Sequence, residues 1–280
     1  MNARAPAQVA DPSFRILQDI AKDLAKGDIS FPTFSAATVE VRKALEDPNV
    51  NADKLARVVS REPLLSAKIV RMANSVALNP SGRAVADVRT AVIRVGQSNV
   101  RSVAVAVAYE QLRADKDLQK HRARAEAAWK HSANVAAHAY VIAKLARLSP
   151  DEAMFAGLVH DIGYYYLLSL SSRYPELEGH EDALDDVLRN WHASVGQTVL
   201  HSFSLTPAVM EAVGDHEAGT YNMPPAAMKD VVCLANLVCD ATNPIRPQSR
   251  PPIELDEPEL IAYLAAATEQ LGSLQAILHN

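Results

Sequence analysis

Histidine and aspartate residues occupy five positions whose types and surroundings could bind a metal ion. They are His131, His160, Asp161, His192 and His216, and all lie in apolar stretches with helical spacing. Imidazole nitrogens together with carboxylate oxygens suit Zn, Fe, Mn or Ni, although widely spaced ligands do not identify one metal. The alternative is that His160 and Asp161 only close a buried helix. If these side chains form a buried cluster, it needs a cation, a proton or water, because burying it unpaired is costly.

The adjacent His160 and Asp161, in AGLVHDIG at residues 156–163, constrain how such a site is built. Neighbouring residues on a helix point about 100° apart. One ion can therefore be held by both side chains only if it lies over the edge between them, with the remaining ligands on facing helices. The chain must supply several helices around this point.

Helix signals fill most of the chain and predict an all-α fold. Apolar residues recur three or four positions apart in residues 13–27, which predicts a helix there. Asn51 can cap a short helix, and Pro63 suits the first turn of the next one. Two more helices are expected after Asp87 and after Ser98.

The segment before the HDIG motif has clear helix boundaries. Residues 116–148 contain no Gly or Pro and predict one long helix or two in series. The sequence SPDE at 149–152 predicts a capping box, in which Ser149 is the cap and Glu152 bonds back to the cap amide. The next helix carries the His-Asp pair, and Gly163 is expected to end or bend it.

Composition and charge narrow the function classes. The chain has 280 residues, 49% of them apolar, and a formal charge of -5 at pH 7, so no global positive field attracts a nucleic acid. No apolar run approaches the ~20 residues that span a bilayer, and the first ten residues lack the apolar core of a signal peptide. We therefore expect a cytoplasmic protein that binds neither nucleic acid nor membrane. Cys233 and Cys239 suit buried thiols better than a disulfide.

Two stretches of the chain resemble a known family. HDIG with an upstream helical histidine is similar to the HD superfamily of metal-dependent phosphohydrolases. Residues 31–75, which begin FPTFS and end RMANS, resemble the opening of the HDOD family, the HD-related output domain of bacterial signalling proteins. This resemblance implies two packed helical halves, the second of them HD-like. The expected segments are an N-terminal helical lead (1–27), an HDOD-like module (28–240, with halves 28–115 and 116–240), and a proline-rich linker with a C-terminal helical extension (241–280).

The resemblance also implies a ligand set for the metal. His131 matches the first histidine of the superfamily and His160 with Asp161 its His-Asp pair, while His192 and His216 match later histidines of the related HD-GYP phosphodiesterases. Three positions depart from the pattern, because Asn236 replaces an aspartate, Tyr164 a lysine and Asp215 a histidine. An amide offers a neutral oxygen without the charge that holds a divalent cation, and a phenol cannot grip a phosphate oxygen as a cation does. Asp240, one turn after Asn236, is the alternative ligand.

These departures imply a stand-alone signalling module that acts by binding a protein or a small ligand. A nucleotide is one such ligand. The module's degenerate site would require no cofactor and would hold a divalent metal (Fe, Mn, Zn or Ni) weakly. The alternative is a metal-dependent phosphohydrolase that uses the HDIG site. No receiver, nucleotide-cyclase or membrane segment fits in the chain, so its input is expected from a separate signalling protein. The expected partner surface is the polar rim of residues 61–75: Arg61, Lys68, Arg71 and Asn74.

Overall fold

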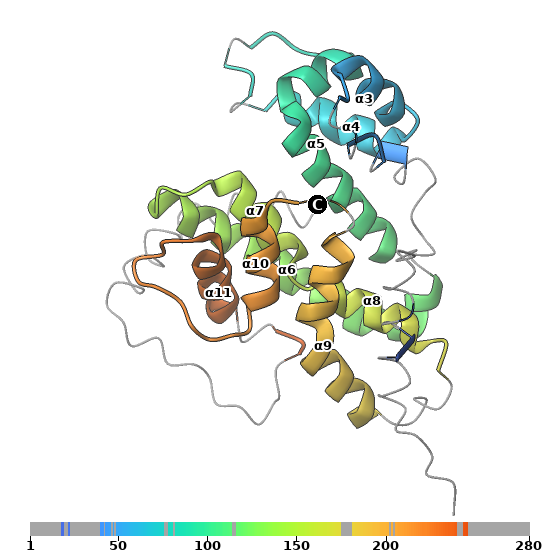
Figure 1. The fold of residues 1–280 in the computed structure, drawn as a ribbon, viewed down its shortest axis with the longest axis vertical. Helices are drawn as coiled ribbons and strands as arrows, with labels where there is room; N and C mark the ends of the chain where they lie inside the picture. The colour runs from blue at the N-terminus through green and yellow to red at the C-terminus, as the bar shows by residue number, and fades with distance from the viewer. Residues whose placement is uncertain are drawn as a thin grey trace, which may run out of the picture.

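All regular elements in the described part of the chain are helices (Figure 1), and the all-α prediction is confirmed. The computed structural model describes Gln18, Asp19, Lys22 and residues 40–245 without 42, 46, 48, 76, 77, 81, 114, 115, 175–180, 202, 204 and 240–242. None of the helices described is long and apolar enough to span a bilayer. The predicted helix at 13–27, the linker and the C-terminal extension lie almost entirely outside these residues.

The first group of helices packs around an apolar core. It consists of α3 (Ala52–Val59), α4 (Pro63–Ala73) and the first part of α5 (Val88–Arg113). Asn51 caps α3 as predicted, because its Oδ1 accepts a hydrogen bond from the Lys54 amide at 2.8 Å. Pro63 is the first residue of α4. The N–H of a first helical residue has no partner within the helix, so proline, which lacks this group, costs no hydrogen bond there. The fully buried side chains of this core include Leu55, Leu65 and Ile69.

Helix α5 changes direction at Gly96 and connects the two groups of helices. Gly96 has φ 78° and ψ 159°, which lie outside the helical region and suit a residue without a Cβ. The helices predicted after Asp87 and after Ser98 are the two segments that meet there. In the second segment, Val107 packs in the first core and Val105 in the second. Figure 1 shows α5 running from α3 and α4 into the other group.

The second group contains the predicted metal ligands. Its elements are the 3-10 turn η1 (Lys116–His121), α6 (Arg122–Leu145), α7 (Pro150–Val159), α8 (Ile162–Ser171), α9 (Glu181–His201), α10 (Pro207–Asp215) and α11 (Met228–Val238). Residues 116–148 thus form two elements in series. Helix α7 packs on α6, α9 packs on α8, and α11 packs on both α10 and α6. This packing surrounds the α7–α8 junction with helices.

Gly163 lies inside α8, so the prediction that it ends or bends a helix is wrong. The helix is interrupted earlier, at His160 and Asp161, between the end of α7 and the start of α8. A Cβ on Gly163 would lie 2.0 Å from the His192 carbonyl oxygen and 2.5 Å from the Gly196 nitrogen. The glycine is therefore required for the direct packing of α9 on α8, which brings His192 to the site.

The capping box predicted for SPDE is not formed. Ser149 precedes α7, but its side chain makes no capping hydrogen bond. Glu152 instead accepts a hydrogen bond from the hydroxyl of Thr206, whose side chain caps α10. A hydrogen bond between the starts of α7 and α10 is thus formed in place of the predicted bond from Glu152 to its own helix start, because α7 and α10 are packed together.

Candidate metal centre

The helices of the second group bring all the predicted ligands to one point. His131 is on α6, His160 and Asp161 are at the α7–α8 junction, His192 is on α9, His216 follows α10, and Asn236 is on α11. All six are buried, with at most 5% of any one exposed. Asp240, the alternative to Asn236, lies outside the described residues.

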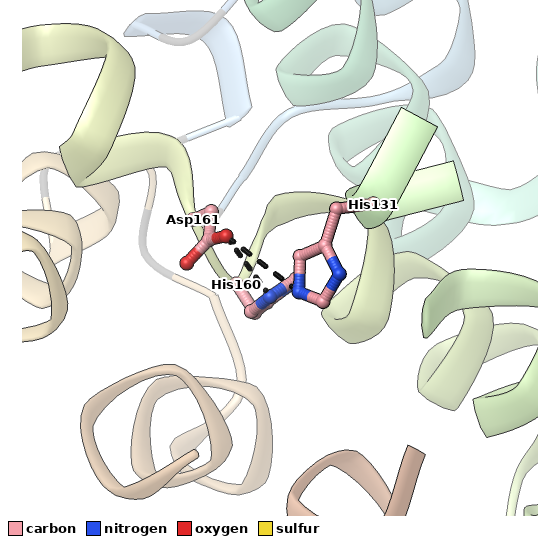
Figure 2. A group of neighbouring side chains, drawn as sticks. All are labelled: His131, His160 and Asp161. Carbon is pink, nitrogen blue, oxygen red and sulfur yellow. Dashed lines mark ion pairs between the residues drawn. The ribbon is translucent and has the colours of Figure 1, made fainter. Parts of the chain in front are cut away.

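His131, His160 and Asp161 form one group of candidate ligands (Figure 2). The distance from Asp161 Oδ2 to His160 Nε2 is 3.2 Å, and the distance to His131 Nε2 is 4.0 Å. Asn236 Oδ1 lies 2.9 Å from His131 Nε2. Ligands that each lie ~2.1 Å from one ion are roughly 3 to 4 Å apart, so these spacings fit a common cation.

Asp161, His192 and His216 form a second group. Asp161 Oδ1 lies 3.3 Å from His216 Nε2 and 3.6 Å from His192 Nε2. The two imidazole Nε2 atoms are 3.1 Å apart. Asp161 therefore belongs to both groups, with Oδ2 facing the first and Oδ1 facing the second.

Backbone carbonyls orient three of the histidine rings. In each, Nδ1 lies close to a carbonyl oxygen of the preceding turn: His160 to Gly157 at 2.7 Å, His192 to Leu188 at 2.8 Å, and His216 to Val213 at 2.7 Å. A carbonyl only accepts, so each Nδ1 carries a proton and the neutral ring presents the lone pair of Nε2 to the centre. The close Nε2 atoms of His192 and His216 therefore require a proton or a metal ion between them.

Burial and the charge of Asp161 set the protonation of the cluster. Burial lowers the pKa of His131 to about 4, so this ring is neutral near pH 7. Burial opposes the charging of His216 as well, but the adjacent carboxylate outweighs it and raises the pKa of His216. Burial would raise the pKa of Asp161, yet the surrounding histidines, His160 first, hold it well below its usual value. Both shifts favour an ionised carboxylate at Asp161 beside a protonated ring at His216.

The unsatisfied atoms of the cluster fit a divalent cation. Both oxygens of Asp161 and Nε2 of His160 are buried and make no hydrogen bond within the described part of the chain. Buried polar atoms nearly always have a partner, and the imidazole, carboxylate and amide donors suit Fe, Mn, Zn or Ni. Such an ion would polarise a phosphate oxygen and acidify a bound water. The residues that would hold one ion are His131, His160, Asp161 and Asn236, and those for a second are Asp161, His192 and His216.

Comparison with known sequences identifies the family. The HDOD domain family matches residues 31–218, more than half of the chain. The chain belongs to the HDOD family. A protein of Treponema pallidum (strain Nichols) is 22% identical to this HDOD protein over an alignment of 224 positions, which covers 74% of this chain and 40% of that protein. The chain therefore spans less than half the length of that relative.

Two solved structures share the fold of this HDOD protein. One is from Shewanella amazonensis SB2B and is named a "putative metal-dependent phosphohydrolase"; its TM-score is 0.68 at 24% identity, over 95% of this chain and 99% of that one. The other is from Marinobacter aquaeolei VT8 and is named a "putative signal transduction protein"; its TM-score is 0.51 at 16% identity, over 96% of this chain and 66% of that one. At these identities the likeness establishes the fold and not the activity.

Tyr164 fills the position at which the resemblance predicts a lysine. Its side chain is buried, and burial raises the pKa of its phenol to about 12, so it carries no charge near pH 7. The neighbouring cation is Arg124, which pairs with Glu181 at 2.6 Å and with Asp185 at 2.5 Å. Arg124 was not predicted from the sequence, because its carboxylate partners are 57 and 61 residues away. Its charge is already balanced by two carboxylates of α9.

The residues predicted to bind a partner lie on or beside α4, away from the metal centre. Arg61 and Lys68 form ion pairs with carboxylates, those of Glu40 and Glu110. The Asn74 amide both donates to and accepts from the Val85 backbone, each at 2.7 Å, and so holds the following loop against the end of α4. Arg71 is exposed. The surface is thus a rim of arginine and lysine in which Asn74 serves the fold.

Proposed function

We propose that this HDOD protein is a signal-transduction module that acts by binding another molecule, and that its buried centre holds a divalent metal without hydrolysing phosphodiesters. A single observation carries the proposal: every candidate ligand is buried, and so is the tyrosine at the lysine position. A phosphodiester must reach the metal and have its developing charge balanced by a nearby cation. The enclosed donors favour a metal that stabilises the fold. The name of the Marinobacter relative supports the signalling role.

A metal-dependent phosphohydrolase is the second candidate. It is favoured by the two ligand groups that share Asp161, because paired metal ions about 3.5 to 4 Å apart activate water in many phosphatases. The name of the Shewanella relative supports this candidate.

One experiment distinguishes the signalling module from the phosphohydrolase. Protein purified without chelator would be analysed for Fe, Mn, Zn and Ni and then assayed with a generic phosphodiester and with cyclic dinucleotides, beside His160→Ala. We expect substoichiometric metal and no hydrolysis above the variant. Near-stoichiometric metal with hydrolysis that His160→Ala abolishes would instead establish the phosphohydrolase.

The protein-binding form of the proposal uses the rim at α4. Arg61 is 63% exposed and its ion pair with Glu40 is a surface one, so reversing its charge should leave the fold intact. We expect the double variant Arg61→Glu and Arg71→Glu to lose a partner that wild-type protein retains in a pull-down from cell extract. Arg57→Glu, an exposed change on α3, is the matched control. Retention of the partner by the double variant would remove this surface from consideration.

The small-ligand form has its own candidate site between the two groups of helices. A cavity of about 680 Å³ lies there, lined by α5, α7 and the start of α10. This volume suits a small organic ligand. The lining has two acidic residues, Asp151 and Glu152, and one basic residue, Arg101, which favours a neutral or cationic ligand over a nucleotide. Ala106→Trp would fill the cavity, so any ligand found by thermal shift should lose binding to that variant while His160→Ala retains it.

A further inference from the structure

We infer that Glu217 supplies the negative charge that the metal centre lacks at Asn236, and that it acts through the Asn236 amide. The inference rests on the metal-binding part of the proposed function. Glu217 follows His216 directly and was not among the site residues predicted from the sequence, since nothing in the sequence connects it with α11. It does not belong to either group of candidate ligands.

The contacts of Glu217 determine which way the Asn236 amide points. Asn236 Nδ2 donates to Glu217 Oε1 at 3.0 Å, while Asn236 Oδ1 lies 2.9 Å from His131 Nε2. An ionised carboxylate can only accept, so the NH2 group must face Glu217 and the oxygen must face the centre. Glu217 at 3.0 Å, helped by the His216 carbonyl oxygen at 3.5 Å from the same nitrogen, therefore converts a side chain that could turn either way into an oxygen ligand with a fixed direction.

Glu217 is itself held in place from outside the centre. Asn243 Nδ2 donates to the same Oε1 at 3.2 Å, and Asn243 Oδ1 accepts from the Ile245 amide at 2.9 Å. The Glu217 side chain is 38% exposed, in contrast to the buried ligands. The carboxylate thus lies at the edge of the centre, where retaining its charge costs little desolvation.

The charge of Glu217 reaches the candidate ligands. Its Oε1 lies 3.9 Å from His216 Nε2 and is one hydrogen bond from Asn236. An aspartate at position 236 would give the ion an oxygen and a charge from one side chain. Here the amide gives the oxygen and the glutamate gives the charge. Outer residues that orient metal ligands typically change metal affinity about 10- to 100-fold when they are replaced.

A series of charge-exchange variants tests whether Asn236 supplies the oxygen and Glu217 the negative charge. The variants are Glu217→Gln, Asn236→Asp and the double variant, which moves the carboxylate from position 217 to position 236. The affinity of chelator-stripped protein for Mn²⁺ and for Zn²⁺ would be measured by competition with a chromophoric chelator, and folding by circular dichroism. Glu211→Gln is the control, because Glu211 is an exposed carboxylate of α10 that pairs with Lys229 away from the centre.

We expect Glu217→Gln to weaken binding ~10- to 100-fold and the control to leave it unchanged. Asn236→Asp alone should not bind more tightly than wild type, because it sets a carboxylate oxygen against Glu217 at the present 3.0 Å contact. The double variant should return to within a few-fold of wild type.

Two results would overturn the inference alone: wild-type affinity in folded Glu217→Gln, or tighter binding in Asn236→Asp than in the double variant. If neither wild type nor the double variant binds either metal, the metal-binding part of the proposed function fails and this inference fails with it.

Discussion

The two groups of helices differ in what they bury. Among the described residues, every buried polar or charged side chain belongs to the second group, between His131 and Asn236. The buried side chains of the first group are apolar, as in Leu65 and Ile69. Its polar residues are exposed or partly buried, and among them Arg61 and Lys68 form ion pairs.

This difference indicates where each group can contribute to function. A buried carboxylate among histidines is costly unless a cation or proton offsets its charge, and the net stability of a domain is only about 5–15 kcal/mol. The second group therefore carries a cluster that needs a cation or a proton, and the proposed metal would supply that cation. The first group can contribute through its surface and through the cavity that it shares with α7 and α10.

The largest expected effect comes from the close approach of α8 and α9. Gly163→Ala would place a Cβ 2.0 Å from the His192 carbonyl oxygen, where backbone must move. We expect it to lower the free energy of unfolding by about 3 kcal/mol or more, measured by urea denaturation. Gly214→Ala is the matched control, since its Cβ would meet only the end of the Gln197 side chain, which can turn away at the cost of one hydrogen bond to the Met210 carbonyl. Equal losses in both variants would contradict this account of the site's assembly.

Metal should stabilise the protein through the second group. Mn²⁺ at about 100 times its dissociation constant should raise the free energy of unfolding by ~2.7 kcal/mol. His160→Ala should remove this shift, because it deletes a candidate ligand. Leu65→Ala should lower stability by roughly 2 to 5 kcal/mol yet keep the shift, because Leu65 lies in the first core. A shift that survives His160→Ala would place the ion elsewhere.

Asp230 gives a smaller effect in the second group. Its carboxylate accepts hydrogen bonds from the Asn222, Ala226 and Ala227 amides, which fixes the loop before α11. We expect Asp230→Asn to cost about 2 kcal/mol near pH 7. Burial opposes ionisation, but these bonds outweigh it and hold the pKa of Asp230 below 3.8. The stabilisation is therefore present above that value and is lost as the pH falls through the folded pKa.

Urea denaturation of wild type and Asp230→Asn at about pH 7 and about pH 3 would measure this difference, with Asp182→Asn as an exposed control on α9. A gap between wild type and Asp230→Asn that stays constant in acid would show that the carboxylate charge is not what stabilises the loop.

The smallest expected effect belongs to the surface of the first group. Arg61→Glu should change the free energy of unfolding by less than about 0.5 kcal/mol, because the ion pair with Glu40 is exposed on both sides. Thermal denaturation would measure it. A loss of more than 1 kcal/mol, on the order of a buried contact, would mean that this rim supports the fold rather than a partner.

The sequence by itself determined the helices and the identity of the candidate ligands. Asn51 and Pro63 mark helix starts because capping and proline geometry depend on neighbouring residues. The HDIG motif and the separate histidines predicted a cluster because those side chains share a chemistry. The resemblance to the HDOD family placed Asn236 among them, and α11 brings it there.

Only the tertiary structure decided the contacts between residues far apart in the chain. It placed Gly163 against α9. It paired Glu152 with Thr206 by a hydrogen bond, where the sequence predicted a capping box. It also set the two oxygens of Asp161 toward two different groups of histidines. It also brought Glu217 to Asn236. Local patterns report which side chains a helix presents, whereas these contacts depend on how closely and at what angle two helices pack, which is set by all the side chains between them.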